Sequence, residues 1–124
     1  MPAVEQLRGQ RIVADPADLD AVAAALPAGR TMLRFAPDEA LLIEGTVRLD
    51  DPVAIVEDEV GFVALTVERD VVVRHTEWSL PSDVGAFAQG SIAGVPAKLA
   101  WLPDGRAWIV THAAYAAELQ DRLT

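Results

Sequence analysis

The chain has 124 residues, of which 52% are hydrophobic and 23% charged, with a formal net charge of −9 and no cysteine. This length and apolar content predict one folded domain and exclude a disordered chain. The lack of cysteine excludes disulfides and thiolate metal sites. A strongly negative surface repels phosphate groups, so neither nucleic acid nor a membrane surface is an expected partner.

The N-terminal segment lacks the apolar core that a secretory signal peptide carries. No apolar run in the sequence approaches the roughly 20 residues that a membrane-spanning helix needs. We therefore expect a cytoplasmic protein.

One helix is predicted in the N-terminal quarter of the chain. Residues 1–14 show no clear period, and we interpret them as a tail that leads into a short extended piece. Asp15 and Pro16 suit the N-cap and the first helical position. The apolar residues that follow recur at helical spacing, which predicts a helix over 16–26. These residues are Leu19, Val22, Ala23 and Leu26.

The central part of the sequence changes to patterns that are typical of strands. Strands are predicted at 31–35, 41–47, 53–56 and 62–67. The β-branched run over 71–73 favours a further strand, whereas a helix that begins near residue 70 is the alternative. A run this short does not decide between the two.

Residues 77–90 form the longest irregular stretch, and connections of this length often carry function. After it, a hairpin of 95–101 and 106–110 is predicted, with a type I turn between the strands. Thr111 is expected to cap a final helix, whose apolar stripe comprises Tyr115, Leu119 and Leu123. Because helices bracket a run of strands, the pattern predicts an α+β fold, an antiparallel sheet with two helices on one face.

Side chains that carry chemistry are few and scattered. The densest acidic group comprises Asp50, Asp51, Glu57, Asp58 and Glu59. Clustered carboxylates hold Ca²⁺ or Mg²⁺ in many proteins, but the spacing of a calcium-binding EF-hand is absent here. Solvation of turns and strand edges explains the group equally well. We expect neither a metal nor a cofactor.

A catalytic pair is the next possibility that the sequence raises. His75 and Glu77 share a face if their segment is extended, and Ser79 follows closely. Closeness in sequence does not make a catalytic triad, and the G-x-S-x-G pattern is missing. A hydrolase that uses His75 and Glu77 therefore ranks last, and we expect no catalytic activity of the chain's own.

The three tryptophans have different predicted roles. Trp101 and Trp108 lie on the two strands of the predicted hairpin, where a cross-strand pair in the core accounts for them. Trp78 lies in the long loop and is the best candidate for an interface anchor. Its removal is then expected to weaken association while leaving the stability of the chain nearly unchanged. The candidate interface or ligand residues are His75, Glu77, Trp78, Asp83 and Phe87.

Several segments occur in an order that suggests a family. They are 34–42 (RFAPDEALL), 57–59 (EDE), 87–94 (FAQGSIAG), Trp101, 108–111 (WIVT) and 115–119 (YAAEL). This order resembles aminomethyltransferase-like folate domains, in particular the gamma subunit of heterotetrameric sarcosine oxidase. The resemblance covers 31–123, and Ala40 stands where that family often has Trp.

The resemblance implies a ferredoxin-like α+β core and a noncatalytic subunit that packs against larger flavin- and folate-binding partners. It carries over no catalytic residue. The first functional hypothesis is therefore a small accessory or interaction subunit, bound to a protein partner or to copies of itself. The alternative is a small-ligand-binding domain with a site near the 77–90 loop. A pocket of roughly a few hundred cubic ångström near Trp78 would favour the alternative.

Overall fold

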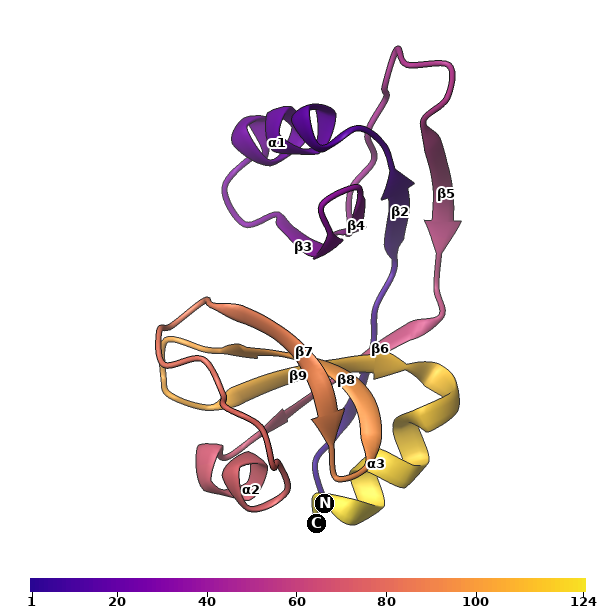
Figure 1. Ribbon diagram of the computed structural model, residues 1–124. Coiled ribbons are helices and arrows are strands. Elements are labelled where there is room, and N and C mark those ends of the chain that lie inside the picture. The colour runs from indigo at the N-terminus through magenta and orange to yellow at the C-terminus, as the bar shows by residue number, and fades with distance from the viewer. The chain divides into compact units, whose positions relative to one another are not determined.

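The computed structural model describes all 124 residues, and they divide into two compact units (Figure 1). Unit 1 comprises Met1–Gln6 and Gly61–Thr124, and unit 2 comprises Leu7–Val60, which is inserted between them in the sequence. Each unit has its own antiparallel sheet. That the chain is one domain stays a prediction, because two such units can unfold in one step or in two.

The sheet of unit 1 has five strands in the order β1-β6-β9-β8-β7. These are β1 (Val4–Gln6), β6 (Phe62–Val67), β9 (Ala107–His112), β8 (Val95–Trp101) and β7 (Phe87–Ile92). Strand β6 lies between β1 and β9, and its first four residues are all buried. A short, continuous apolar run of this kind is typical of a strand that is covered on both faces.

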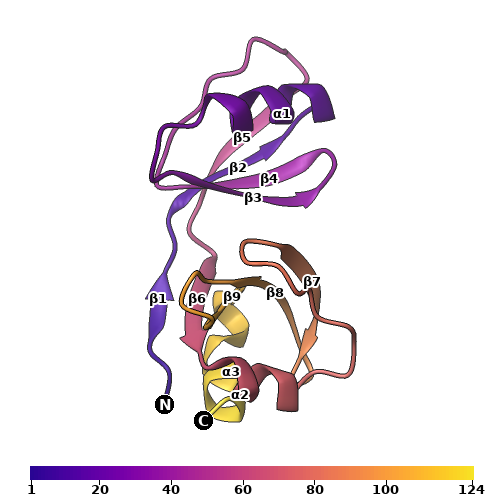
Figure 2. The ribbon, with the colours of Figure 1, turned by 90° about the vertical axis from the view of Figure 1, so that its left-hand side faces the viewer.

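Two helices of unit 1 lie on the same side of this sheet (Figure 2). They are α2 (Arg69–Arg74) and α3 (Ala116–Arg122), and a 3₁₀ turn over Ala113–Tyr115 precedes α3. Val72 of α2 and Leu119 of α3 are fully buried in one core cluster with Leu65 of β6. The apolar side of each helix therefore supplies the core of unit 1.

The sheet of unit 2 has four strands in the order β3-β4-β2-β5. These are β2 (Gly9–Val13), β3 (Thr31–Ala36), β4 (Glu39–Ile43) and β5 (Ile55–Glu59). Helix α1 (Pro16–Ala25) packs on this sheet through Leu19, which is fully buried with Ile12 and Leu42. The helix ends before Pro27, because a residue that precedes proline is pushed to the extended backbone that Leu26 adopts.

The α+β class with antiparallel strands is confirmed. One sheet was predicted, however, and the strands form two. The two helices predicted from the sequence lie in different units, α1 on the sheet of unit 2 and α3 on that of unit 1. The ferredoxin-like arrangement is not confirmed. The division between sheets depends on which strands pair over long distances in the sequence, and the local pattern does not specify this.

The prediction of an N-terminal tail is wrong, although the short extended piece predicted at its end is present as part of β2. Residues 4–6 and 9–13 are strands, and β2 lies between β4 and β5. Gly9, for example, is paired with both Ile43 and Glu59. Partners this distant in the sequence leave no periodic signal in the segment itself.

Several boundaries also differ from the predictions. The strand predicted over 41–47 ends at Ile43, because Glu44 has a positive φ of 51°. The strand predicted at 53–56 lies at Ile55–Glu59, so the acidic run belongs to β5. For 71–73, the helical alternative is right. The irregular stretch ends earlier than predicted, since β7 begins at Phe87.

Two predictions near the C-terminus are wrong. Thr111 does not cap a helix: it is buried in β9, and its hydroxyl donates to the Pro96 carbonyl at 2.8 Å. Trp101 and Trp108 do not form a cross-strand pair, since Trp101 is opposite Ala107 and Trp108 is opposite Ala100. Trp101 therefore faces the core, and Trp108 faces the other side of the sheet.

None of the helices combines the length and the apolar character that crossing a membrane requires.

Candidate ligand and interface site

A cleft of about 500 Å³ in unit 1 brings three of the five predicted site residues together. It is lined by Arg74, His75, Glu77, Trp78, Ser91, Ala93 and Gly94. The first four follow one another at the end of α2 and the start of the loop, and the others belong to the end of β7 and the turn after it. The cleft thus lies where α2 meets the β7–β8 hairpin.

His75 joins these two parts of the cleft. Its Nδ1 atom lies 2.8 Å from the Val71 carbonyl, and because a carbonyl only accepts, Nδ1 carries the proton. Nε2 is not hydrogen-bonded to any other group of the chain. The backbone carbonyl of His75 accepts the Ala93 N–H at 2.8 Å, which ties the end of α2 to the hairpin turn.

The turn between β7 and β8 is the strained part of the cleft. Ala93 and Gly94 have φ angles of 51° and 78°, as a two-residue type I′ turn requires. Alanine rarely adopts a positive φ. Besides its bond to His75, Ala93 accepts a hydrogen bond from Nη1 of Arg122 at 2.6 Å, so contacts on both sides hold the turn in place.

Trp78 has a structural role in this cleft. Its indole Nε1–H donates to the Ser91 carbonyl at 2.7 Å, and its half-buried ring packs against the core cluster of unit 1. These contacts oppose the expectation that Trp78 contributes little to stability. The part of the ring that stays exposed leaves the interface role a prediction.

Glu77 lines the cleft but does not pair with His75, and the other two candidate residues, Asp83 and Phe87, lie outside the cleft. Glu77 is exposed and forms no ion pair with His75. Asp83 is exposed and does not line the cleft, and neither does Phe87, which is half-buried opposite Ala100. Ser79 is also absent from the lining.

Sequence reasoning missed Arg74, Ser91 and Ala93 as site residues. The sequence did not decide whether the segment that contains Arg74 is a helix or a strand, so it did not predict on which side the Arg74 side chain lies. Nothing in the sequence marks Ala93 as a turn residue except the glycine after it. No hydrogen bond joins Ser91 to His75 or Glu77. The arginine, carboxylate, imidazole and indole of the cleft suit binding of a small polar molecule.

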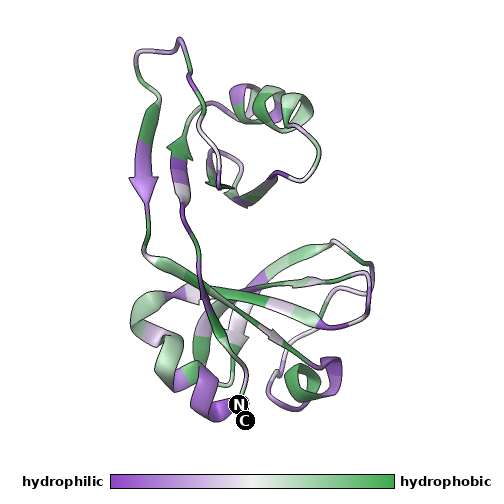
Figure 3. Ribbon diagram, turned by 180° about the vertical axis from the view of Figure 1, so that it is seen from behind, coloured by the Kyte–Doolittle hydropathy of each residue, from purple (hydrophilic) through white to green (hydrophobic).

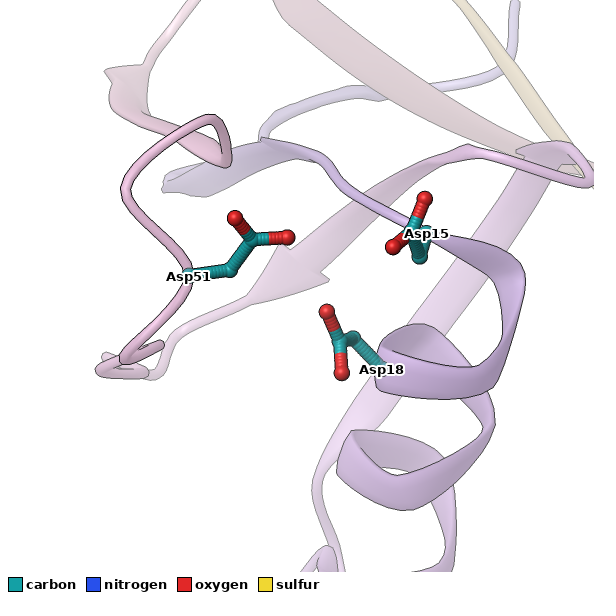
Figure 4. A group of neighbouring side chains, drawn as sticks. All are labelled: Asp15, Asp18 and Asp51. Atoms are coloured by element: carbon teal, nitrogen blue, oxygen red, sulfur yellow. The ribbon is translucent and has the colours of Figure 1, made fainter.

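A second group of polar side chains lies at the start of α1. The carboxylates of Asp15, Asp18 and Asp51 lie within 4.8 Å of one another (Figure 4). Only Asp51 belongs to the acidic group singled out in the sequence. The positive end of the helix dipole favours carboxylates at this position. Asp51 also accepts the Val53 N–H at 3.0 Å, so a local structural role accounts for it.

Two antiparallel sheets define the architectural class of this chain. In the sequence, the strands of unit 2 come between β1 and β6 of unit 1. The fold is similar to that of a chain in the structure of heterotetrameric sarcosine oxidase from Corynebacterium sp. U-96, determined in complex with pyrrole 2-carboxylate. The TM-score is 0.70 at 17% sequence identity, and the match covers 98% of this chain and 81% of that chain. The weak resemblance found in the sequence is therefore confirmed as a likeness of fold.

No protein-family model matches the sequence. No curated protein sequence matches it either.

Proposed function

We propose that this chain is a small accessory subunit of a sarcosine oxidase-like enzyme complex and has no catalytic activity of its own. The observation that carries the proposal is the likeness of fold over 98% of the chain. The resemblance in sequence adds larger flavin- and folate-binding chains as the expected partners. We also propose that the complex is cytoplasmic and binds neither nucleic acid nor membrane.

The two histidines support a noncatalytic role. Nδ1 of His75 is hydrogen-bonded to a backbone carbonyl. The His112 ring stacks on Phe62 with ring centroids 4.5 Å apart. Neither ring is hydrogen-bonded to a hydroxyl or carboxylate, the arrangement that activates a nucleophile.

The outer edge of β5 is the partner surface that we propose. β5 is the last strand in its sheet, so its outer edge has no partner strand within the chain. Val53 and Ile55 are 79% and 46% exposed, and Glu57 and Asp58 are exposed as well. Figure 3 shows β5 changing from hydrophobic at its start to hydrophilic at its end. A basic edge strand of a larger chain fits this surface by charge and by backbone pairing.

The test is a pull-down of the tagged full-length chain from its source cells, with mass spectrometry of what co-purifies. We expect stoichiometric recovery of larger chains that carry flavin. Ile55→Asp should reduce this recovery several-fold. Val84→Asp is the matched control, because Val84 is equally apolar, 61% exposed and located in unit 1. Recovery of the chain alone, as a monomer or homodimer, would contradict the proposal.

A small-ligand-binding function is the second candidate, and the cleft beside Trp78 is the observation that favours it. Its volume of about 500 Å³ is in the range of small-molecule sites. A fragment screen by NMR that follows the Trp78 indole N–H tests this function. A hit should shift this signal and lose affinity in Arg74→Gln. If no fragment shifts the signal, the ligand-binding function is wrong.

A further inference from the structure

Unit 2 contains a groove that neither functional hypothesis uses. A cleft of about 570 Å³ is lined by Arg8, Arg30, Leu26, Leu42, Glu44 and Thr46, among others. A second cavity of about 360 Å³ shares Leu26, Leu42 and Thr46 with the first and continues along α1 to Arg48. The two cavities share part of their lining, and we call them together the groove.

The arginines of the groove stand apart from most other cations of the chain. The chain has ten Lys and Arg residues and a net charge of −9. Four of the ten form ion pairs, and two more lie over aromatic rings. The four that do neither are Arg8, Arg30, Arg48 and Arg74. Three of these four line the groove, which is a local concentration of unpaired positive charge on an acidic protein.

The floor of the groove is apolar. Leu42 is 2% exposed and Leu26 is half-buried, and Val47 and Leu49 continue this surface in the second cavity. Glu44 is the one carboxylate in the cleft that holds Arg8 and Arg30, so its lining keeps a positive excess. Asp18 lies in the second cavity. The groove therefore has Arg8 and Arg30 in its first cleft and Arg48 in the second cavity, with an apolar floor beside them.

The backbone around Arg8 is in close contact with the end of β4. The Arg8 carbonyl accepts the Glu44 N–H at 2.8 Å. A Cβ on Gly9 would lie 1.9 Å from the Leu42 carbonyl oxygen, so the two backbones are in direct contact. Glu44 has a φ of 51°, and strained residues of this kind concentrate at binding sites, where the surrounding structure supports them. These contacts define the backbone position of Arg8.

We propose that this groove binds a small organic anion, with Arg8 and Arg30 on a carboxylate or phosphate group and the apolar body on Leu26 and Leu42. Guanidinium groups bind both anions through paired, charge-assisted hydrogen bonds. The unpaired charges and the apolar floor are properties of unit 2 alone, so the proposal does not depend on the accessory-subunit function.

NMR titration of the ¹⁵N-labelled full-length chain tests the proposal. The probes are hexanoate, hexyl phosphate and 1-hexanol, which share an apolar tail and differ in the head group. We expect one or both anions to shift the amide signals of Arg8, Gly9 and 44–46, and 1-hexanol to bind at least about tenfold more weakly. Binding of hexanoate alone assigns a carboxylate ligand, and binding of hexyl phosphate alone assigns a phosphate ligand.

The variants Arg8→Gln and Arg30→Gln should each weaken anion binding by roughly tenfold. Both side chains are exposed and unpaired, so the variants should fold normally. Arg106→Gln is the control, because Arg106 is also an exposed arginine but lies in unit 1 and lines neither the groove nor the cleft beside Trp78. The proposal is overturned if neither anion binds, if 1-hexanol binds as tightly as the anions, or if the control variant loses as much affinity as the two others.

Discussion

The indole ring of Trp78 lies so close to Gly90 that no side chain fits between them. An ideal Cβ on Gly90 would be 2.6 Å from Cε2 of Trp78. The neighbouring Ser91 carbonyl accepts the indole N–H at 2.7 Å. The absence of a side chain at Gly90 thus lets the loop that follows α2 pack on β7.

Gly90→Ala should therefore destabilise the chain by about 1–3 kcal/mol, because the new methyl group overlaps the Trp78 ring. Urea unfolding measures this change. In a Trp78→Ala background the same substitution should cost close to nothing, since the ring it overlaps is gone. Ser91→Ala, an exposed change on the same strand, is the control. Equal costs of Gly90→Ala in both backgrounds would show that the contact is unimportant.

Trp101→Phe should cost about 1–3 kcal/mol, because it removes a buried hydrogen bond. The indole Nε1–H of Trp101 donates to the Pro81 carbonyl at 2.5 Å, and the Arg69 guanidinium carbon lies 4.3 Å from its ring centroid. Trp108→Phe is the control on the facing strand and should cost less than half as much. A comparable loss for both variants in thermal unfolding would argue against a special role for the Trp101 hydrogen bond.

Leu119→Ala should lower the free energy of unfolding by about 2–5 kcal/mol, because Leu119 is fully buried and its truncation leaves a cavity. The exposed neighbour Glu118 pairs with Arg122 one turn away. Glu118→Ala should therefore cost only about 0.5 kcal/mol. A small effect of Leu119→Ala in denaturant unfolding would mean that α3 packs loosely on the sheet.

The pKa of the Asp104 carboxyl should lie below its usual value. The main cause is the hydrogen bond from the Arg106 backbone N–H, at 2.9 Å, and the Arg106 side chain adds to it. A pKa lowered by folding stabilises the folded chain above the unfolded-state pKa, and this contribution is lost as the pH falls through the folded-state pKa.

An NMR titration of Asp104 measures this shift. Arg106→Gln removes the guanidinium but keeps the backbone N–H, so the pKa of Asp104 should rise only part of the way to its usual value. A complete return would show that the side chain, and not the backbone, holds the carboxylate.

We expect the two units to unfold in one transition. Unit 2 is small for an independent core, and its two ends continue into β1 and β6, which pair with each other. All three tryptophans lie in unit 1, so their fluorescence reports on that unit alone. Leu19→Ala, in unit 2, should lower the midpoint of the fluorescence transition and of the circular dichroism transition equally. Two separate midpoints would establish two domains.

The sequence alone predicted the elements that depend on neighbours in the chain. Helix α1 follows from Pro16 and the apolar stripe that contains Leu19, and β6 follows from its continuous apolar run. The hairpin of β8 and β9 follows from the turn residues at 102–105. Of the candidate site, the sequence found the stretch from His75 to Trp78, because polar groups and an aromatic ring occur there in a long connection.

Only the tertiary structure decided which strands pair and which side chains share a cleft. β2 takes its partners from β4 and β5, and Trp78 packs on a glycine of a strand that the sequence presented as a loop. Arg8 and Arg30 line one cleft although they are distant in the sequence. Helical periods and turn residues act within a few positions, whereas pairing and clefts join residues tens of positions apart. Whether these distant contacts form depends on how the whole chain packs, so the pattern of a single segment does not predict them.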